Sequence, residues 1–484
     1  MRYSMLVYIV KMCQTLTEAA KYISAVSEGE LRAELLENGK QMFVQIQSVL
    51  EQHRRDLCSA EVLDKLCELE AQWQSGGNDL AERIDTFANE LPASVSYQAR
   101  AVFFAELGEK WDAMESVYEY MRDDPRFDPI IVRTPVGRVV ERDGKREQEI
   151  LYKDFLTPMG VPSLGYDEYN IEDDCPELAF ISQPYESCTL EQFWPENIAK
   201  HTRLVYLPYF LPFLVLKEHK ETLCQLPVYR HAWKVIGASE RHYGFYKKYA
   251  VNGGGNMLIT GLPKLDPVVK LRNSKTPIPK QWRKVVEGRK VFLWNTWYDY
   301  SSSSIDYFDT IMEWFRSHDD CALIWRRHPL TDTVTRLYYS PEVYAKLQSY
   351  IEAVGAMENG ICDDEASCDI SFSCSDAQIS DYSSLMCQYL PLNKPLLWTK
   401  NSADTRKFDK QHSGFFIDWR WMEDTSDAAG VIRFLERIRQ GEDEKAVIRQ
   451  SILHRDLPMA DGHSGERVCE EIWTLIHQED LEKQ

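Results

Sequence analysis

Four polar segments that follow apolar, strand-like runs carry residue types that bind phosphate. In the first, "ISDYSSLMCQYL", an aspartate and two serines stand between such a run and a helical pattern, at Asp381, Ser383 and Ser384. The first turn of a helix has unpaired backbone N–H groups and partial positive charge, so hydroxyl and amide groups there can bind an anion. The alternative is that Asp381 or Ser383 only caps the helix.

The second segment, "WRRHPL", ends the run "CALIW" with Arg326, Arg327 and His328. Two guanidinium groups and an imidazole that leave a strand together can hold a diphosphate through charge-assisted hydrogen bonds. The alternative is a basic strand end that only faces solvent.

Two further segments are less specific. "TGLPKLD" contains Thr260, Gly261 and Lys264, and "LWNTW" places Asn295 and Thr296 after the run "VFLW". Each has a simpler interpretation, a turn for the first and helix capping for the second. Because all four segments follow predicted strands, together they predict a phosphate-binding cleft between two lobes.

Three regions with different patterns must position these segments. Residues 1–95 are polar and helical in period, which predicts an N-terminal helical domain. Residues 96–268 alternate apolar runs with helical segments, which predicts parallel strands in βαβ units. Residues 269–484 begin with a basic connection and repeat this alternation, with C-terminal helices that finish the second lobe. The predicted fold class is α/β, with two Rossmann-like lobes facing a cleft and an added helical domain.

Composition excludes several classes of protein. The formal net charge of −20 argues against a nucleic-acid binder and against adsorption to anionic membrane. Twelve cysteines show neither a CxxC pair nor a common zinc spacing, which predicts reduced thiols in a cytoplasmic protein and no metal site. The apolar run near the N-terminus is too short to span a bilayer.

The segments "TGLPKLD", "LWNTW", "RRHP" and "SDAQISDYSSLMCQYLPLNKPLLW", in this order, resemble the CDP-glycerol glycerophosphotransferase family, which is similar to wall teichoic acid polymerases and has a GT-B fold. The resemblance covers roughly residues 101–400. It implies transfer of glycerol phosphate, or a related polyol phosphate, from a CDP-linked donor to a hydroxyl of a cell-surface glycan or teichoic-acid-like acceptor, with release of CMP. The first lobe would then be the acceptor side and the second the donor side.

The resemblance also implies roles for individual residues. His328 and Arg327 would hold the donor diphosphate, and Asp381, Ser383 and Ser384 would bind donor phosphate or glycerol hydroxyls. These roles suit the side chains, because phosphoryl transfer depends on positioning and charge neutralisation more than on covalent help. His328 and Asp381 are therefore expected to be catalytic. No cofactor is required, although a divalent cation could take part. The other expected substrate-binding residues are Arg326, Asn295, Thr296, Thr260, Gly261 and Lys264.

One departure from the family concerns the general base. Teichoic acid polymerases of this family carry a Trp-His-Gly-Thr loop in the first lobe, whereas the corresponding strand end here reads "YLPYF" at residues 206–210 and has no histidine. Tyr209 is the expected catalytic residue there, with His219 and Glu240 as the next candidates. The apolar run that continues into "KEHK" is either an ordinary strand and loop or a segment that contacts the inner face of a membrane, if the acceptor is lipid-linked.

Two alternatives to this function stay in place. A GT-B glycosyltransferase would use the same diphosphate site for a nucleotide sugar. A non-catalytic nucleotide-binding member of a polymer-assembly complex would fit the missing histidine and the added helical domain.

Overall fold

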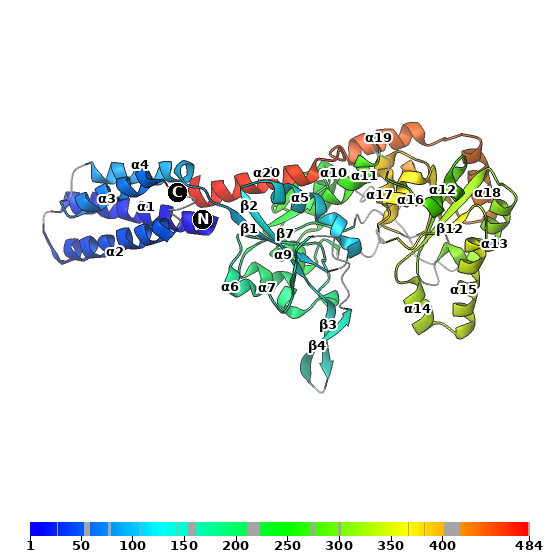
Figure 1. Cartoon of the computed structure of the whole chain (residues 1–484), viewed down its shortest axis with the longest axis horizontal. Coiled ribbons are helices and arrows are strands. Elements are labelled where there is room, and N and C mark those ends of the chain that lie inside the picture. Colours follow the sequence, from blue (N-terminus) through cyan, green and yellow to red (C-terminus); the bar gives the residue numbers. More distant parts are fainter. Residues whose placement is uncertain are drawn as a thin grey trace.

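The structure is a computed structural model in which three parts follow one another along the longest axis of the molecule (Figure 1). A helical bundle lies at one end, a first lobe built on a parallel sheet lies in the middle, and a second lobe with its own parallel sheet lies at the other end. The described residues are 1–26, 28–52, 59–75, 79–106, 108–142, 144–152, 161–210, 223–272, 276–298, 302–365, 367–381, 383–400 and 417–482.

The bundle consists of α1 (Tyr3–Ala25), α2 (Glu30–Gln52), α3 (Ala60–Trp73) and α4 (Leu80–Ser94). Apolar residues recur along each helix at helical spacing, so each helix presents one apolar stripe to a shared core. A Cβ atom at Gly39 would lie 2.1 Å from the Trp73 ring, and the lack of one lets α2 and α3 approach. The Trp73 indole N–H donates to the Leu36 carbonyl (2.9 Å), so this buried ring keeps a polar partner.

The strands of the first sheet are β1 (Ala99–Ala105), β2 (Phe127–Arg133), β5 (Leu164–Gly165), β6 (Leu178–Ile181), β7 (Arg203–Tyr206), β8 (Lys234–Gly237) and β9 (Met257–Ile259). They are parallel, in the order β5-β2-β1-β6-β7-β8-β9. The central strands are apolar and buried on both faces, which is typical of a parallel sheet covered by helices. Its helices are α5 (Glu115–Asp123), α6 (Ile171–Asp174), α7 (Pro195–Ala199), α9 (Pro227–His231), α10 (Glu240–Tyr249) and α11 (Asp266–Lys270).

An antiparallel hairpin projects from this lobe (Figure 1). Its strands are β3 (Val136–Arg142) and β4 (Lys145–Tyr152). Because β3 begins soon after β2 ends, the hairpin leaves from the carboxyl edge of the sheet. Ligands of open α/β sheets bind at this edge.

The strands of the second sheet are β10 (Lys290–Thr296), β11 (Cys321–Arg327), β12 (Gly360–Cys362), β13 (Ala377–Ser380), β14 (Leu396–Thr399) and β15 (Glu423–Thr425). They are also parallel, in the order β12-β11-β10-β13-β14-β15. The α/β fold class with two lobes and a helical region is therefore confirmed. The helices of this part are α12 (Lys280–Val286), α13 (Ser303–Arg316), α14 (Thr331–Tyr338), α15 (Pro341–Gly355), α16 (Asp369–Cys374), α17 (Leu385–Tyr389), α18 (Ala428–Arg439) and α19 (Ala446–Asp456).

The last long helix, α20 (Ser464–His477), returns along the first lobe to the bundle (Figure 1). It packs against α5, and Trp473 stacks on Tyr97 with ring centroids 5.8 Å apart. The Tyr3 hydroxyl donates to the Ile476 carbonyl (3.0 Å), which ties α20 to α1. We expected the C-terminal helices to finish the second lobe. The apolar face of α20 instead packs against the first lobe. The domain boundaries near residues 95 and 268 stay predictions.

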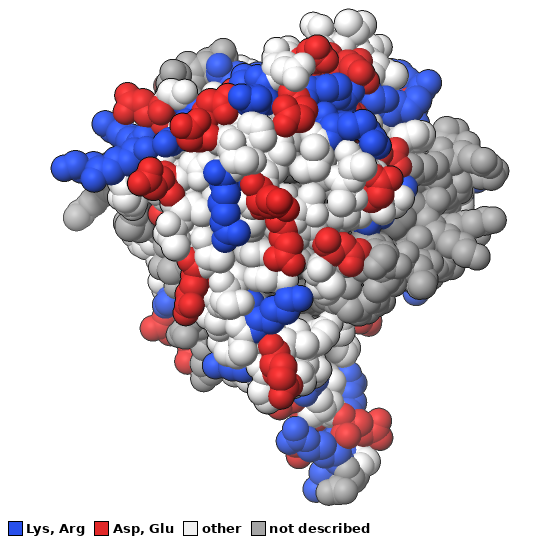
Figure 2. All heavy atoms as spheres, turned by 90° about the vertical axis from the view of Figure 1, so that its right-hand side faces the viewer, with Lys and Arg blue, Asp and Glu red and all other residues white. Residues whose placement is uncertain are grey.

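The surface and the cysteines add three observations. Lys and Arg side chains are interspersed with Asp and Glu over the described part of the end face of the second lobe (Figure 2). The described cysteines are free thiols, whereas Cys58 lies outside the described residues. Within the described ranges, no helix combines the length and the apolar character that crossing a bilayer requires.

Candidate active site

The second sheet has a topological switch point between β10 and β13. β10 and β13 are neighbours, but the connection after β10 runs to β11 on one side and the connection after β13 runs to β14 on the other. The register pairs Asn295 with Ser380 and Thr296 with Arg327, and the Ser380 hydroxyl donates to Asn295 Oδ1 (3.2 Å). Open α/β sheets bind ligands outside the carboxyl ends of strands at such points. Three of the four predicted segments therefore meet where a ligand is expected.

Asn295 and Thr296 form the buried floor of this edge. The Asn295 amide donates to the Arg326 carbonyl (3.3 Å), and Thr296 Oγ1 accepts from the Trp325 indole (3.2 Å). Both side chains thus hold β10 against β11. Direct contact with a substrate stays a prediction for both.

His328 leaves this edge in a defined orientation. Its backbone N–H donates to the Thr296 carbonyl (3.0 Å), and its Nδ1 accepts from the Leu330 N–H (3.1 Å). The ring centroid lies 4.9 Å from that of Trp297 and 4.8 Å from that of Tyr298. Because Nδ1 is an acceptor, the neutral ring carries its proton on Nε2. This half-buried ring is therefore suited to donate from Nε2 to a phosphate oxygen.

The two adjacent arginines have different partners. The Arg326 side chain, 10% exposed, pairs with Asp363 at 2.8 Å, and the Asp363 side chain is fully buried. Arg327 pairs with Asp364 at 2.5 Å, but Asp364 is 69% exposed. A solvated ion pair is weak and exchanges readily, whereas a buried one is held in place. Arg327 can therefore turn to a diphosphate, while Arg326 neutralises a buried carboxylate. The substrate contact predicted for Arg326 stays a prediction.

Asp381 faces α13 and not the helix that follows it in sequence. Its Oδ2 accepts from the backbone N–H of Ser303, the first residue of α13, at 2.7 Å. A carboxylate at a helix N-terminus satisfies an unpaired donor and interacts favourably with the helix dipole. The side chain thus joins the ends of β10 and β13 through α13. The serine run at residues 301–304 was the sequence signal for this helix start.

Ser383 and Ser384 differ in exposure. The Ser383 hydroxyl is buried and accepts from the Leu385 N–H (3.2 Å), whereas Ser384 is exposed. The helix after them, α17, has only five residues and therefore contributes little dipole. This geometry favours the capping alternative for Ser383, and an anion seat at this place stays a prediction.

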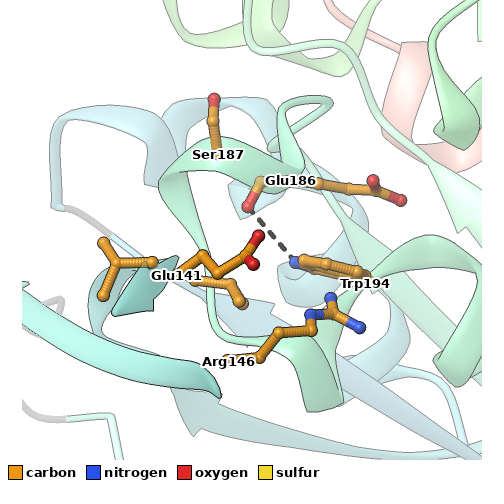
Figure 3. A pocket seen from close by; sticks show the side chains of 7 residues that line it. Glu141, Arg146, Glu186, Ser187 and Trp194 are labelled. Carbon is orange, nitrogen blue, oxygen red and sulfur yellow. Dashed lines mark hydrogen bonds between the residues drawn. The ribbon is translucent and has the colours of Figure 1, made fainter. Parts of the chain in front are cut away.

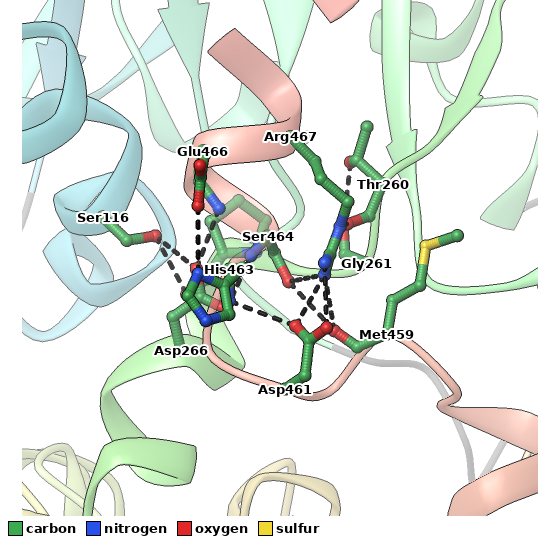
Figure 4. Close-up of polar contacts among 12 residues, drawn as sticks. Ser116, Thr260, Gly261, Asp266, Met459, Asp461, His463, Ser464, Glu466 and Arg467 are labelled. Carbon is green, nitrogen blue, oxygen red and sulfur yellow. Dashed lines mark hydrogen bonds and ion pairs between the residues drawn. The ribbon is translucent and has the colours of Figure 1, made fainter. Parts of the chain in front are cut away.

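The segment "TGLPKLD" anchors α20 to the first lobe (Figure 4). Asp266 accepts from the backbone N–H groups of Ser464 (3.1 Å) and Gly465 (2.8 Å) at the start of α20. Arg467 donates to the Thr260 carbonyl at 2.7 Å. Gly261 has a φ of +83°, and a Cβ atom there would lie 2.6 Å from Ser464 Oγ, so only glycine fits. Thr260 and Gly261 thus lie away from the second-sheet edge.

Lys264 lies at the contact between the lobes. Its Nζ donates to both carboxylate oxygens of Asp112 (2.7 and 2.6 Å), and the Gln388 amide donates to Asp112 Oδ2 (2.9 Å). Asp112 belongs to a short 3-10 helix, η1 (Gly108–Ala113), which follows β1, and Gln388 belongs to α17, which follows β13. Segments that leave the carboxyl edges of the two sheets therefore touch at Asp112.

Acidic side chains gather beside this contact. Burial raises the pKa of the Glu115 carboxyl to about 7, and the nearby carboxylates of Glu119 and Asp369 add to the shift. Burial also raises the pKa of Asp369. Glu115 belongs to the first lobe and Asp369 to the second, so protonation of Glu115 near pH 7 changes the charge between the lobes.

Tyr209 lies half-buried at the end of β7. The Lys110 ammonium lies 5.0 Å from the centroid of its ring. Burial and the nearby Tyr185 raise the pKa of the Tyr209 phenol above its usual range, so the phenol keeps its proton at neutral pH. It can donate a hydrogen bond but is poorly suited to be a base. Glu240 is exposed at the start of α10, and His219 lies outside the described residues.

A pocket of about 300 Å³ lies on the first lobe, between the hairpin and the segment after β6 (Figure 3). The Arg146 guanidinium lies 5.4 Å from the centroid of the Trp194 ring, and the indole N–H donates to the Glu186 carbonyl (3.2 Å). No local sequence pattern indicates this pocket, because its walls come from segments that only folding brings together. The lining residues are Val139, Val140, Glu141, Arg146, Glu186, Ser187 and Trp194.

Two parallel sheets, each with helices on both faces, define a GT-B-like enzyme fold, and solved structures share it. The wall teichoic acid polymerase TagF is similar at a TM-score of 0.50 and 15% identity, over 88% of this chain and 99% of that chain. A putative UDP-N-acetylglucosamine 2-epimerase from Listeria monocytogenes has a TM-score of 0.50 at 11% identity, over 79% of this chain and 97% of that chain. The S. aureus MnaA-UDP structure has a TM-score of 0.50 at 11% identity, over 78% of this chain and 97% of that chain.

The family is shown by its sequence model. The model described as CDP-Glycerol:Poly(glycerophosphate) glycerophosphotransferase matches residues 218–474, which is more than half of the chain. The chain belongs to this family, and the protein is an enzyme of the glycerophosphotransferase type. A comparison with curated protein sequences finds no match. The resemblance noted in the sequence is confirmed.

Proposed function

We propose that this enzyme transfers glycerol phosphate from CDP-glycerol to a hydroxyl of a teichoic-acid-like or capsular glycan and releases CMP. One observation carries the proposal: in a chain of this family, Thr296, Arg327 and His328 leave neighbouring strands at the switch point of the second sheet. A diphosphate bound there would lie against an imidazole donor and an exchangeable guanidinium.

The chemistry needs little covalent help from the protein. The acceptor oxygen attacks the β-phosphorus of CDP-glycerol, and CMP leaves with the bridging oxygen. His328 donates from Nε2 to a non-bridging oxygen, and Arg327 exchanges Asp364 for the donor. Both groups neutralise charge that grows on the phosphoryl oxygens, which is the main route to catalysis of phosphoryl transfer.

A nucleotide sugar is the second candidate donor, because the switch-point residues contact a diphosphate and not the group attached to it. We test the two donors on the purified full chain, with poly(glycerophosphate) as the acceptor probe. CMP release from CDP-glycerol that depends on the acceptor is expected. UDP release from UDP-N-acetylglucosamine, with no CMP release, would contradict the proposal.

The acceptor and the cellular location are proposals of the same kind. A lipid-linked acceptor would bring this enzyme to the inner, cytoplasmic face of a membrane. The apolar segment that motivated membrane contact lies largely within residues 211–222, outside the described residues.

The switch-point carboxylate gives a prediction about stability. Asp381→Ala should lower the free energy of unfolding by about 1–3 kcal/mol, because the Ser303 N–H loses its buried acceptor. Ser383→Ala should lower it by about 1 kcal/mol as a lost cap. Chemical denaturation measures these losses, and titration with CDP-glycerol measures donor affinity on the same variants. The exposed Ser384→Ala variant is the control for stability. A large loss of affinity with unchanged stability would restore the donor-binding role of Asp381 or Ser383.

A further inference from the structure

The first sheet has a switch point of the same kind as the second. β1 and β6 are neighbours, but the connection after β1 runs to β2 on one side and the connection after β6 runs to β7 on the other. Glu106 directly follows β1, and Gln183 follows β6. The Gln183 amide donates to Glu106 Oε2 at 2.9 Å. This pair corresponds to Asn295 and Ser380 in the second sheet, and it lies where an α/β sheet binds its ligand.

The Glu106 carboxylate is engaged on one oxygen only. The Lys110 ammonium and the Gln183 amide both donate to Oε2. Glu106 is 4% exposed, and its buried Oε1 has no hydrogen-bond partner among the described residues. A buried carboxylate oxygen without a hydrogen bond lowers the stability of the folded protein, and native proteins contain few of them. Such an oxygen therefore indicates a missing partner, either a ligand or a water molecule.

The surroundings of Glu106 belong to the acceptor side. Lys110 also contacts the Tyr209 ring, so residues at the ends of β1, β6 and β7 form one cluster. Tyr209 keeps its proton, and Glu106 adds to the rise of the pKa of this phenol. Within the described part of the cluster, Glu106 is the residue whose carboxylate keeps an oxygen without a hydrogen-bond partner.

The two switch points are joined by short connections. Asp112 lies a few residues after Glu106, and Gln388 lies a few residues after Asp381. The Gln388 amide donates to Asp112 Oδ2 at 2.9 Å. The contact between the lobes therefore lies next to both carboxyl edges. This is the arrangement in which a group on the first lobe can act on a donor bound to the second.

We infer that Glu106 is the general base that removes the proton of the acceptor hydroxyl. The proton passes to Oε1 as the acceptor oxygen bonds to the β-phosphorus of CDP-glycerol. The bond from that phosphorus to the bridging oxygen breaks, and CMP leaves with the oxygen and the electron pair. Lys110 and Gln183 are positioning residues that hold Oε2 and direct Oε1. The inference rests on the proposed function.

The test compares two buried glutamates on one sheet. Glu106→Gln removes the base but keeps the size of the side chain, and kcat should fall by about 100-fold or more. The Kd for CDP-glycerol should not change, and the acid limb of the kcat/KM profile against pH should disappear. Glu177 is the matched control, because it is equally buried but precedes β6 at the opposite edge and accepts from the Arg100 N–H (2.7 Å). Glu177→Gln should keep kcat.

Two further variants guard against misfolding. Glu106→Asp keeps a charge near Lys110 and should fold with a reduced kcat. Glu106→Ala should recover activity when formate is added, because a small carboxylate can replace the missing base. A Glu106→Gln variant with wild-type kcat and an unchanged pH profile would overturn the inference and leave the proposed function intact. A wild-type protein that releases no CMP from CDP-glycerol with poly(glycerophosphate) would overturn the proposed function first, and the inference with it.

Discussion

Replacing His328 by alanine is expected to lower kcat by about 100-fold or more while the protein stays folded. The imidazole lies at the carboxyl end of β11, beside the switch point, and is not part of the apolar core. Its Nδ1 accepts from the Leu330 N–H, so the neutral ring carries its proton on Nε2, the nitrogen that can donate to the phosphoryl group. The alanine variant loses this donor at the place where charge grows in the transition state.

The measurement separates catalysis from folding. Turnover is measured as CMP release, and the melting temperature and circular dichroism report the fold. His318 is the matched control, since its ring also contacts a tryptophan, with 4.2 Å between the centroids of His318 and Trp314. It lies after α13, next to the amino end of β11, where no ligand is expected. His318→Ala should cost some stability and keep kcat. Wild-type turnover in a folded His328→Ala protein would refute the assignment.

The second large effect concerns stability. Asp363→Ala should lower the free energy of unfolding by about 3–5 kcal/mol, because it removes the buried carboxylate that pairs with the Arg326 guanidinium at 2.8 Å. The neighbouring residue is the control. Asp364→Ala removes an exposed partner of Arg327 and should cost at most about 1 kcal/mol. Denaturant unfolding monitored by tryptophan fluorescence gives both values.

The same pair of variants also informs on the site. Freed from Asp364, Arg327 should bind the donor at least as well as in the wild-type protein, since the competing carboxylate is gone. If Asp363→Ala and Asp364→Ala were equally stable, the structural role of Arg326 would be refuted, and the substrate-binding role predicted from the sequence would be favoured.

Local pattern determined much of the fold. Apolar runs and helical periods are properties of short segments, so β10, β11 and β13 and the helices of the bundle lie where the sequence indicated. Thr296 is the last residue of β10, and His328 and Asp381 directly follow β11 and β13. Parallel strands align their carboxyl ends, which is why separate segments could be predicted to share one edge.

Only the tertiary structure decided what each polar side chain contacts. Nothing in "WRRHPL" distinguishes Arg326 from Arg327. The two arginines differ because the partner of Arg326 is buried and that of Arg327 is exposed, and both partners come from the segment after β12. Asp381 precedes α17 in sequence but caps α13 in space. Glu106 is part of no sequence motif. Its role is indicated only by the fold, in which Gln183 and Lys110 donate to Oε2 while Oε1 stays without a partner among the described residues. Hydrogen bonds and burial depend on residues that are distant along the chain. A local sequence pattern can therefore indicate candidate site residues, but their contacts follow only from the tertiary structure.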